Sequence, residues 1–204
     1  MHRGPLLFLG VFATFLFGWL GLVFYPQYQL NSLTPETPEG SKEEYPRPLD
    51  GLAAQGFKVY VSEGCVYCHS QQVRAENFGT DVARGWGDRR SVPRDYLYEN
   101  PVLLGTMRTG PDLASIGMRQ GDESWHYLHL YNPRITSPGS IMPPFRYLFD
   151  EHQFTVERSA NALKLPEEWA LPAGREVVPS EQAKALVAYL KAQNRNQPLE
   201  EAKR

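Results

Sequence analysis

The stretch that decides the fold is Cys65-Val66-Tyr67-Cys68-His69, in which two thiols are separated by two residues and an imidazole follows directly. This spacing is typical of covalent attachment of a c-type haem, because both sulfurs reach one edge of the macrocycle and the next residue reaches the iron. We therefore expect Cys65 and Cys68 to anchor one c-type haem, and His69 to coordinate its iron.

Two other readings of this motif fit the rest of the chain poorly. A thioredoxin-like redox pair is typical of a cytosolic βαβ unit, whereas the uncharged stretch from Leu6 to Tyr25 predicts an exported chain. Half of a zinc site would need further ligands, yet the chain has only 2 cysteines in 204 residues. The haem is the interpretation that we keep.

The sixth ligand of the iron is expected to be Met142, in the segment Pro138-Gly139-Ser140-Ile141-Met142-Pro143-Pro144. Prolines fix the backbone of this non-helical loop, so they place the thioether in advance. A thioether opposite histidine raises the reduction potential and is typical of electron-transfer cytochromes. Met107 and Met118 are interpreted instead as residues that fill gaps in the core.

His126 and His129 lie three residues apart in a short predicted helix over 122–130, so they share one face. We interpret them as structural histidines with satisfied hydrogen bonds. Ligation of the iron by two histidines and binding of a separate metal ion remain the alternatives.

An apolar segment near the amino terminus predicts a transmembrane helix. Twenty residues without a charge run from Leu6 to Tyr25, and as a helix they would cover about 30 Å, the thickness of a hydrocarbon core. A cleaved signal peptide would have a shorter apolar region and a small-residue cleavage site, whereas Phe24, Tyr25 and Pro26 follow here. Arg3 precedes the span, so the rest of the chain should face away from the cytoplasm.

The chain divides into four predicted parts. These are an anchor over 1–30, a proline-rich linker over 31–50, a haem-binding domain over 51–195 and a polar tail over 196–204. The linker could hold the domain away from the membrane or lie along a partner's surface. The formal net charge is −2, which does not favour nucleic acid as a partner.

Two amphipathic helices are expected to frame the haem. One covers 56–61, where Gly56 offers a close crossing point. The other follows Ser180, a plausible N-cap, and carries the apolar stripe Ala183, Leu186, Val187 and Leu190. The fold class that we predict is mainly α.

Two motifs resemble class I cytochromes c. Leu-Val-Ala-Tyr-Leu-Lys at 186–191 is similar to the carboxy-terminal helix of that family, and Gly110-Pro111-Asp112-Leu113 is similar to a segment whose proline carbonyl accepts the ring N–H of the haem-ligating histidine. The resemblance implies that Pro111 orients His69. It also implies a class I cytochrome c domain with one amino-terminal transmembrane helix and long loop insertions.

Further motifs resemble one membrane-anchored family, the mono-haem cytochrome c subunit of cbb3-type cytochrome c oxidase. The resemblance covers most of residues 1–149, whereas residues 150–178 show little similarity to that family. The motifs are Ser70-Gln71-Gln72-Val73-Arg74 after the haem motif, Asp81-Val82-Ala83-Arg84-Gly85-Trp86-Gly87, Arg108-Thr109-Gly110-Pro111-Asp112-Leu113, and Asn132-Pro133-Arg134 before Pro138-Gly139-Ser140-Ile141-Met142-Pro143.

The resemblance implies a single-pass protein of the bacterial cytoplasmic (inner) membrane, with the haem domain on the periplasmic side. Such a subunit takes electrons from the di-haem cytochrome c subunit or a soluble cytochrome c and passes them to the haem–copper catalytic subunit. It would be an electron carrier within an oxidoreductase complex, not catalytic alone. The alternatives are the mono-haem subunit of nitric oxide reductase and a haem-based gas-binding or sensing module.

Forty residues separate His69 from Gly110, and this insertion is rich in arginine, with six arginines and no lysine over 70–109. Arginine and tryptophan concentrate at the centres of protein interfaces, but a solvated face is the alternative, on which the arginines pair with Glu76, Asp81, Asp88, Asp95 and Glu99. The family resemblance implies that this segment docks on the catalytic subunit. Arg108, Arg119 and Arg134 are candidate partners for haem propionates.

Overall fold

The computed structural model describes residues 3–203 and is mainly helical, as expected for a cytochrome c domain. The α-helices are α1 (Gly4–Trp19), α2 (Tyr25–Asn31), α3 (Gly51–Ser62), α4 (Ile116–Arg119), α5 (Glu123–Tyr131), α6 (Pro133–Thr136) and α7 (Glu181–Ala192). The strands are β1 (Phe149–Gln153) and β2 (Arg175–Pro179). Short 3₁₀ turns lie at Cys65–Tyr67, Pro93–Tyr96, Arg146–Leu148, Glu167–Trp169 and Glu200–Lys203.

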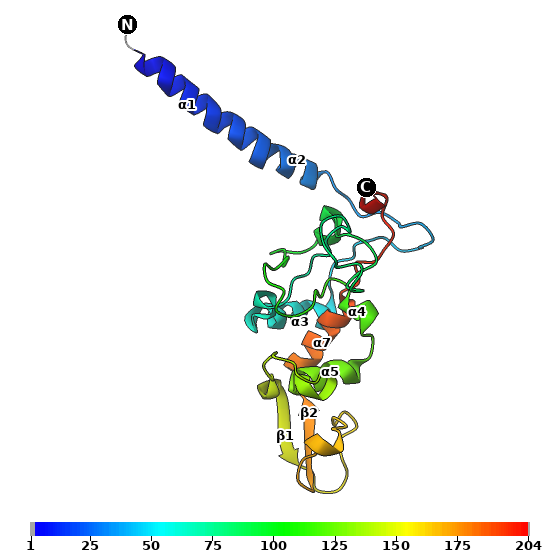
Figure 1. Ribbon diagram of the computed structural model, residues 1–204. Coiled ribbons are helices and arrows are strands. Elements are labelled where there is room, and N and C mark those ends of the chain that lie inside the picture. The colour runs from blue at the N-terminus through cyan, green and yellow to red at the C-terminus, as the bar shows by residue number, and fades with distance from the viewer. Residues whose placement is uncertain (1–2, 204) are drawn as a thin grey trace.

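The amino-terminal helix projects from the rest of the molecule (Figure 1). α1, a π-helical turn at Leu20–Phe24 and α2 form one helical run, Gly4–Asn31, of 28 residues, long and apolar enough to cross a membrane. The widened turn comes directly before Pro26, whose ring would clash with the carbonyl four residues earlier in a regular α-helix. The helix thereby continues through the proline.

The core is the crossing of α3 and α7. A Cβ added at Gly56 would lie 2.5 Å from the carbonyl carbon of Ala185 and 2.7 Å from Cβ of Tyr189, so only glycine permits this approach. α7 begins at the expected N-cap, where Oγ of Ser180 accepts a hydrogen bond from the backbone N–H of Ala183 at 3.3 Å. Both predicted features, the crossing glycine and the cap, are confirmed.

A two-stranded antiparallel sheet was not predicted. β1 pairs with β2 in a register that sets Phe149 opposite Pro179 and Gln153 opposite Arg175. Its connecting loop is closed by buried Glu176, which accepts hydrogen bonds from the hydroxyl and the backbone N–H of Ser159. The hairpin is a loop insertion at the end of the molecule remote from α1 (Figure 1).

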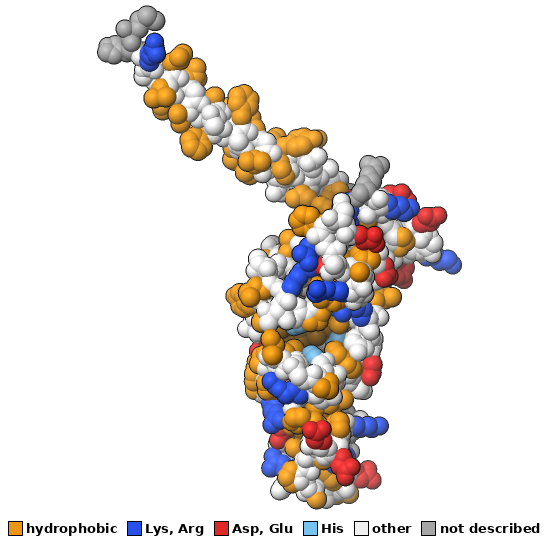
Figure 2. Space-filling model, in the orientation of Figure 1, with side chains coloured by type: hydrophobic (Ala, Val, Ile, Leu, Met, Phe, Trp, Pro, Cys, Tyr) orange, Lys and Arg blue, Asp and Glu red, His pale blue; other side chains and the backbone are white. Residues whose placement is uncertain are grey.

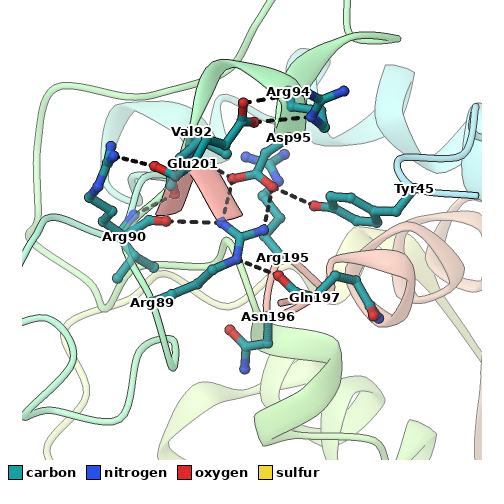
Figure 3. Close-up of polar contacts among 12 residues, drawn as sticks. Tyr45, Arg89, Arg90, Val92, Arg94, Asp95, Arg195, Asn196, Gln197 and Glu201 are labelled. Atoms are coloured by element: carbon teal, nitrogen blue, oxygen red, sulfur yellow. Dashed lines mark hydrogen bonds and ion pairs between the residues drawn. The ribbon is translucent and has the colours of Figure 1, made fainter. Parts of the chain in front are cut away.

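The proline-rich segment lies on the domain rather than free of it. The hydroxyl of Tyr45 donates to buried Asp95 at 2.7 Å, and Arg89 pairs with the same carboxylate at 2.7 Å. Arg94 pairs with Glu36 of the linker at 3.3 Å and with Glu201 of the carboxy-terminal tail at 3.1 Å. Linker, tail and the 89–95 loop therefore form one polar cluster (Figure 3).

Candidate functional site

The residues of the Cys-x-x-Cys-His motif follow directly after α3. Gly64 adopts φ of 69°, a left-handed conformation that a side chain would strain, and it turns the chain from α3 into the 3₁₀ turn Cys65–Tyr67. His69 lies at the end of this turn, and its Nδ1 is 2.8 Å from the carbonyl oxygen of Pro111. Because that oxygen can only accept, Nδ1 donates, and Nε2 is left with its lone pair.

Gly110 allows this approach. A Cβ at position 110 would lie 2.6 Å from Nδ1 and 2.8 Å from Nε2 of His69, which is far inside van der Waals contact. The backbone N–H of Gly110 also donates to the carbonyl of Cys68 at 3.0 Å. The segment carrying Pro111 is thus held directly against the imidazole.

Asp112 fixes the same segment, a role that the sequence analysis missed. Its fully buried carboxylate accepts hydrogen bonds from the hydroxyl of Ser70 at 2.6 Å, and from the backbone N–H groups of Gln72 and Ala114 at 2.8 Å. The signal was available, since a carboxylate directly follows Pro111, but two of its partners, Ser70 and Gln72, lie forty or more residues away in the chain. Asp112 therefore joins the Pro111 segment to the residues after His69.

Met142 comes from a loop anchored at both ends. Gly139 adopts φ of 80° within the turn, and the backbone N–H of Met142 donates to Oγ of Ser140 at 3.3 Å. Beyond the prolines, the N–H of Phe145 donates to the carbonyl of Leu130 in α5 at 2.8 Å. The loop is therefore tied to α5, and Met142 is half-buried.

All five residues singled out from the sequence line one cavity of about 680 Å³. They are Cys65, Cys68, His69, Pro111 and Met142. Figure 2 shows a hollow on the visible face of the domain with histidine side chains exposed inside it. The volume lies within the range of cofactor pockets, about 300–1,000 Å³, and the lining includes the aliphatic residues Leu113, Ile116 and Leu190.

His126 and His129 also line this cavity, and both have hydrogen-bond partners. Nε2 of His126 is 2.7 Å from the carbonyl of Gln120, and Nδ1 of His129 is 2.6 Å from the hydroxyl of Thr136. Burial lowers the pKa of His126, and burial together with neighbouring imidazoles lowers the pKa of His129 to about 4. Both rings are therefore uncharged at neutral pH.

Arg119 supplies a cation at the wall of the cavity. One terminal nitrogen donates to the carbonyl of Asp112, and its buried Nε has no hydrogen-bond partner among residues 3–203. Burial lowers the pKa of this guanidinium. An unpaired N–H beside an apolar cavity is suited to a carboxylate of a bound cofactor.

The Cys65 thiol lacks the lowered pKa of a reactive cysteine. Burial, followed by the neighbouring Glu63, raises the pKa of the Cys65 thiol to about 12, whereas reactive cysteines have lowered pKa values. Cys65 and Cys68 are not joined in a disulfide. No group of three or more His, Cys, Asp or Glu side chains suited to a metal ion occurs within residues 3–203.

The interpretation of Met107 and Met118 as core residues was wrong. Their side chains are 55% and 58% exposed, respectively. Met107 lies in the irregular segment before Gly110 and Met118 in the short helix α4, where the apolar residue that turns inward is Ile116. Neither methionine lines the cavity.

The arginines of the 70–109 insertion hold that segment together. Arg74 and Arg108 both bond to the fully buried carboxylate of Asp81, at 3.0 and 2.5 Å. Burial alone would raise the pKa of Asp81, but these hydrogen bonds lower it well below its usual range. The guanidinium carbons of Arg84 and Arg108 lie 5.0 and 5.5 Å from the ring of Trp86.

These contacts change what the insertion offers to a partner. Arg74, Arg89, Arg94 and Arg108 are engaged in ion pairs within the chain. Docking of this segment on another subunit stays a prediction, and most of its arginines serve the fold first.

A comparison with known protein families agrees with the geometry of the cavity. Residues 33–203 match a family model described as cytochrome c oxidase, mono-heme subunit/FixO. A search of curated proteins finds no match. Since the matched region covers most of the chain, from the linker to the tail, the chain belongs to the FixO family of mono-haem cytochrome c oxidase subunits and is an electron-transfer member of that oxidoreductase complex.

Proposed function

We propose that this chain is the mono-haem subunit of a cbb3-type oxidase, carrying one covalent c-type haem. The observation that carries the proposal is the shared cavity: two thiols and an oriented imidazole from one segment, Pro111 from a second and a thioether from a third line one space. The residues present fit the group, because Arg119 offers an unpaired N–H there and Gly110 leaves room for His69. When bound, the haem supplies a one-electron ferrous–ferric couple.

Each of the five site residues has a distinct role. Cys65 and Cys68 would hold the haem through thioether links, and His69 and Met142 would coordinate its iron. Pro111 holds the His69 ring through its Nδ1–H, which fixes the ring orientation and raises its basicity. Two ligands supplied by the protein would keep rearrangement on electron transfer small.

The location of the haem domain relative to the membrane follows from the amino-terminal helix. As an oxidase subunit with one apolar amino-terminal helix, the chain is attached to the membrane and works with other oxidase subunits. We propose that Arg3 stays on the cytoplasmic side of the inner membrane, which places the haem domain in the periplasm. The anchor, linker, domain and tail correspond to 1–30, 31–50, 51–195 and 196–204.

Specific partners follow from the same proposal. Electrons enter from the di-haem cytochrome c subunit or a soluble cytochrome c and leave to the haem–copper subunit. The mono-haem subunit of nitric oxide reductase remains the second candidate, because its anchor and haem arrangement would be the same. A gas-binding module is disfavoured by Met142, which would close the sixth position of the iron.

Purification of the complex through this chain tests the proposal. We expect the solubilised complex to contain a haem–copper subunit and a di-haem cytochrome, and to reduce oxygen with reduced cytochrome c as donor. Reduction of nitric oxide without oxygen reduction would favour the second candidate. Rapid uptake of carbon monoxide by the ferrous haem of this chain at neutral pH would favour gas binding and contradict electron transfer.

A further inference from the structure

Two histidines of the cavity are anchored in the same way. His69 donates its Nδ1–H to the carbonyl of Pro111. Nδ1 of His129 is 2.6 Å from Oγ1 of Thr136, whose own hydroxyl donates to the carbonyl of Pro133 at 3.3 Å. Because that hydroxyl proton is already used, Oγ1 accepts, so the His129 proton is assigned to Nδ1 and the lone pair to Nε2.

His129 is also held in a fixed orientation. Its ring stacks on Trp125, with ring centroids 4.6 Å apart and planes 10° from parallel. Anchoring of one ring nitrogen on an oxygen atom, with the other left free, is the usual arrangement of a histidine that binds a metal. Both the free nitrogen of His129 and the thioether of Met142 belong to residues that line the cavity with His69.

His126 is anchored through the opposite ring nitrogen, so its lone pair is on Nδ1, next to its own Cβ, and not on the outer Nε2. Its Nε2 is the nitrogen bonded to the carbonyl of Gln120, and only 2% of the residue is exposed. It therefore serves as a matched comparison, one turn away on α5 and lining the same cavity.

We propose that His129 is a reserve axial ligand of the haem iron, which takes the sixth position when Met142 releases it. This inference rests on the proposed function. In the exchange, the bond from iron to the Met142 sulfur breaks and a bond from iron to Nε2 of His129 forms. The lone pair of Nε2 supplies the new bond, and neither a proton nor an electron is gained or lost.

The consequence is protection of the site after loss of the thioether. With two imidazoles the iron stays six-coordinate and closed to small gases, while its reduction potential falls, because thioether ligation is what raises it. A subunit in this state would keep its haem closed but would accept electrons less readily.

The test compares spectra and carbon monoxide binding of the full chain in its purified complex, with covalent haem per chain measured alongside. Met142→Ala is expected to stay low-spin, to lower the potential and to leave the ferrous haem unreactive with carbon monoxide. Met142→Ala/His129→Gln is expected to become high-spin and to bind carbon monoxide stoichiometrically. The control Met142→Ala/His126→Gln should behave like Met142→Ala.

Met142→Ala alone decides the matter if the double variants do not fold. A high-spin, carbon monoxide-binding haem in that single variant would overturn the proposal, as would a low-spin haem that persists without His129. Failure of the proposed function looks different, because the wild-type chain would then lack covalent haem or the spectrum of histidine–methionine ligation.

Discussion

Gly110→Ala perturbs the site at the position where backbone and imidazole are closest. The new Cβ would lie 2.6 Å from Nδ1 of His69, whereas non-bonded heavy atoms prefer about 3.5–4.0 Å. The ring or the Pro111 segment must therefore move by about 1 Å. A shift of that size stretches the 2.8 Å bond between His69 and Pro111 beyond the roughly 3.2 Å limit of an N–H···O hydrogen bond.

Two consequences are expected for the holoprotein. Overpacking lowers the free energy of unfolding by about 1–3 kcal/mol. Loss of the hydrogen bond makes the His69 imidazole a weaker donor, which destabilises ferric iron and raises the reduction potential. Denaturant titration and a potentiometric redox titration of the purified complex measure the two effects.

Gly121→Ala is the matched control, because a Cβ at position 121 has a single neighbour at ordinary contact distance, 3.7 Å away. It should leave the stability within about 0.5 kcal/mol of wild type, as for surface substitutions, and leave the potential unchanged. Wild-type stability and potential in Gly110→Ala, or equal effects of the two substitutions, would refute the reasoning.

Three further predictions concern the frame around the site. Gly56→Ala gains about 1 kcal/mol of helix propensity but forces α3 away from Ala185, so we expect net destabilisation in denaturant melts. A stabilised variant would contradict the close crossing of α3 and α7. Tyr45→Phe removes a hydrogen bond to buried Asp95, which should lower the free energy of unfolding by about 2 kcal/mol and make the linker more sensitive to limited proteolysis. Unchanged cleavage would argue against docking of the linker on the domain. Because the pKa of Asp81 is lowered in the folded state, its ionised carboxylate stabilises the fold fully above about pH 5, and this stabilisation is lost as the pH falls. Asp81→Asn should therefore flatten the acid side of a plot of unfolding free energy against pH. An unaltered curve would speak against that ionised carboxylate.

The parts of the fold that the sequence could predict depend on local chemistry. The Ser180 cap and the apolar stripe of α7 each follow from residues a few positions apart, and both are present. Gly56 predicts a close crossing, but its partners Ala185 and Tyr189 lie far away in the chain. Length and absence of charge likewise identify the amino-terminal helix, although its continuation through Pro26 depends on a π-helical turn that no local pattern announces.

The rest depends on pairs that are distant in the chain. Asp112 meets Ser70 and Gln72 forty or more residues away, and Tyr45 meets Asp95 across fifty, so neither contact leaves a periodic pattern. The β1–β2 hairpin carries buried Glu176 inside a strand, where alternation of polar and apolar residues is broken. The exposure of Met107 and Met118 shows that an apolar side chain without helical periodicity gives no information about its depth.

Covalent attachment of the haem is the claim on which the functional account depends most. The purified wild-type subunit, unfolded and extracted with acidified organic solvent, should keep its haem on the polypeptide, with one haem for each chain. Replacing Cys65 and Cys68 together by alanine should abolish this retention. If the solvent removes the haem from the wild-type chain, or if the chain is colourless with both thiols open to alkylation, the account is contradicted.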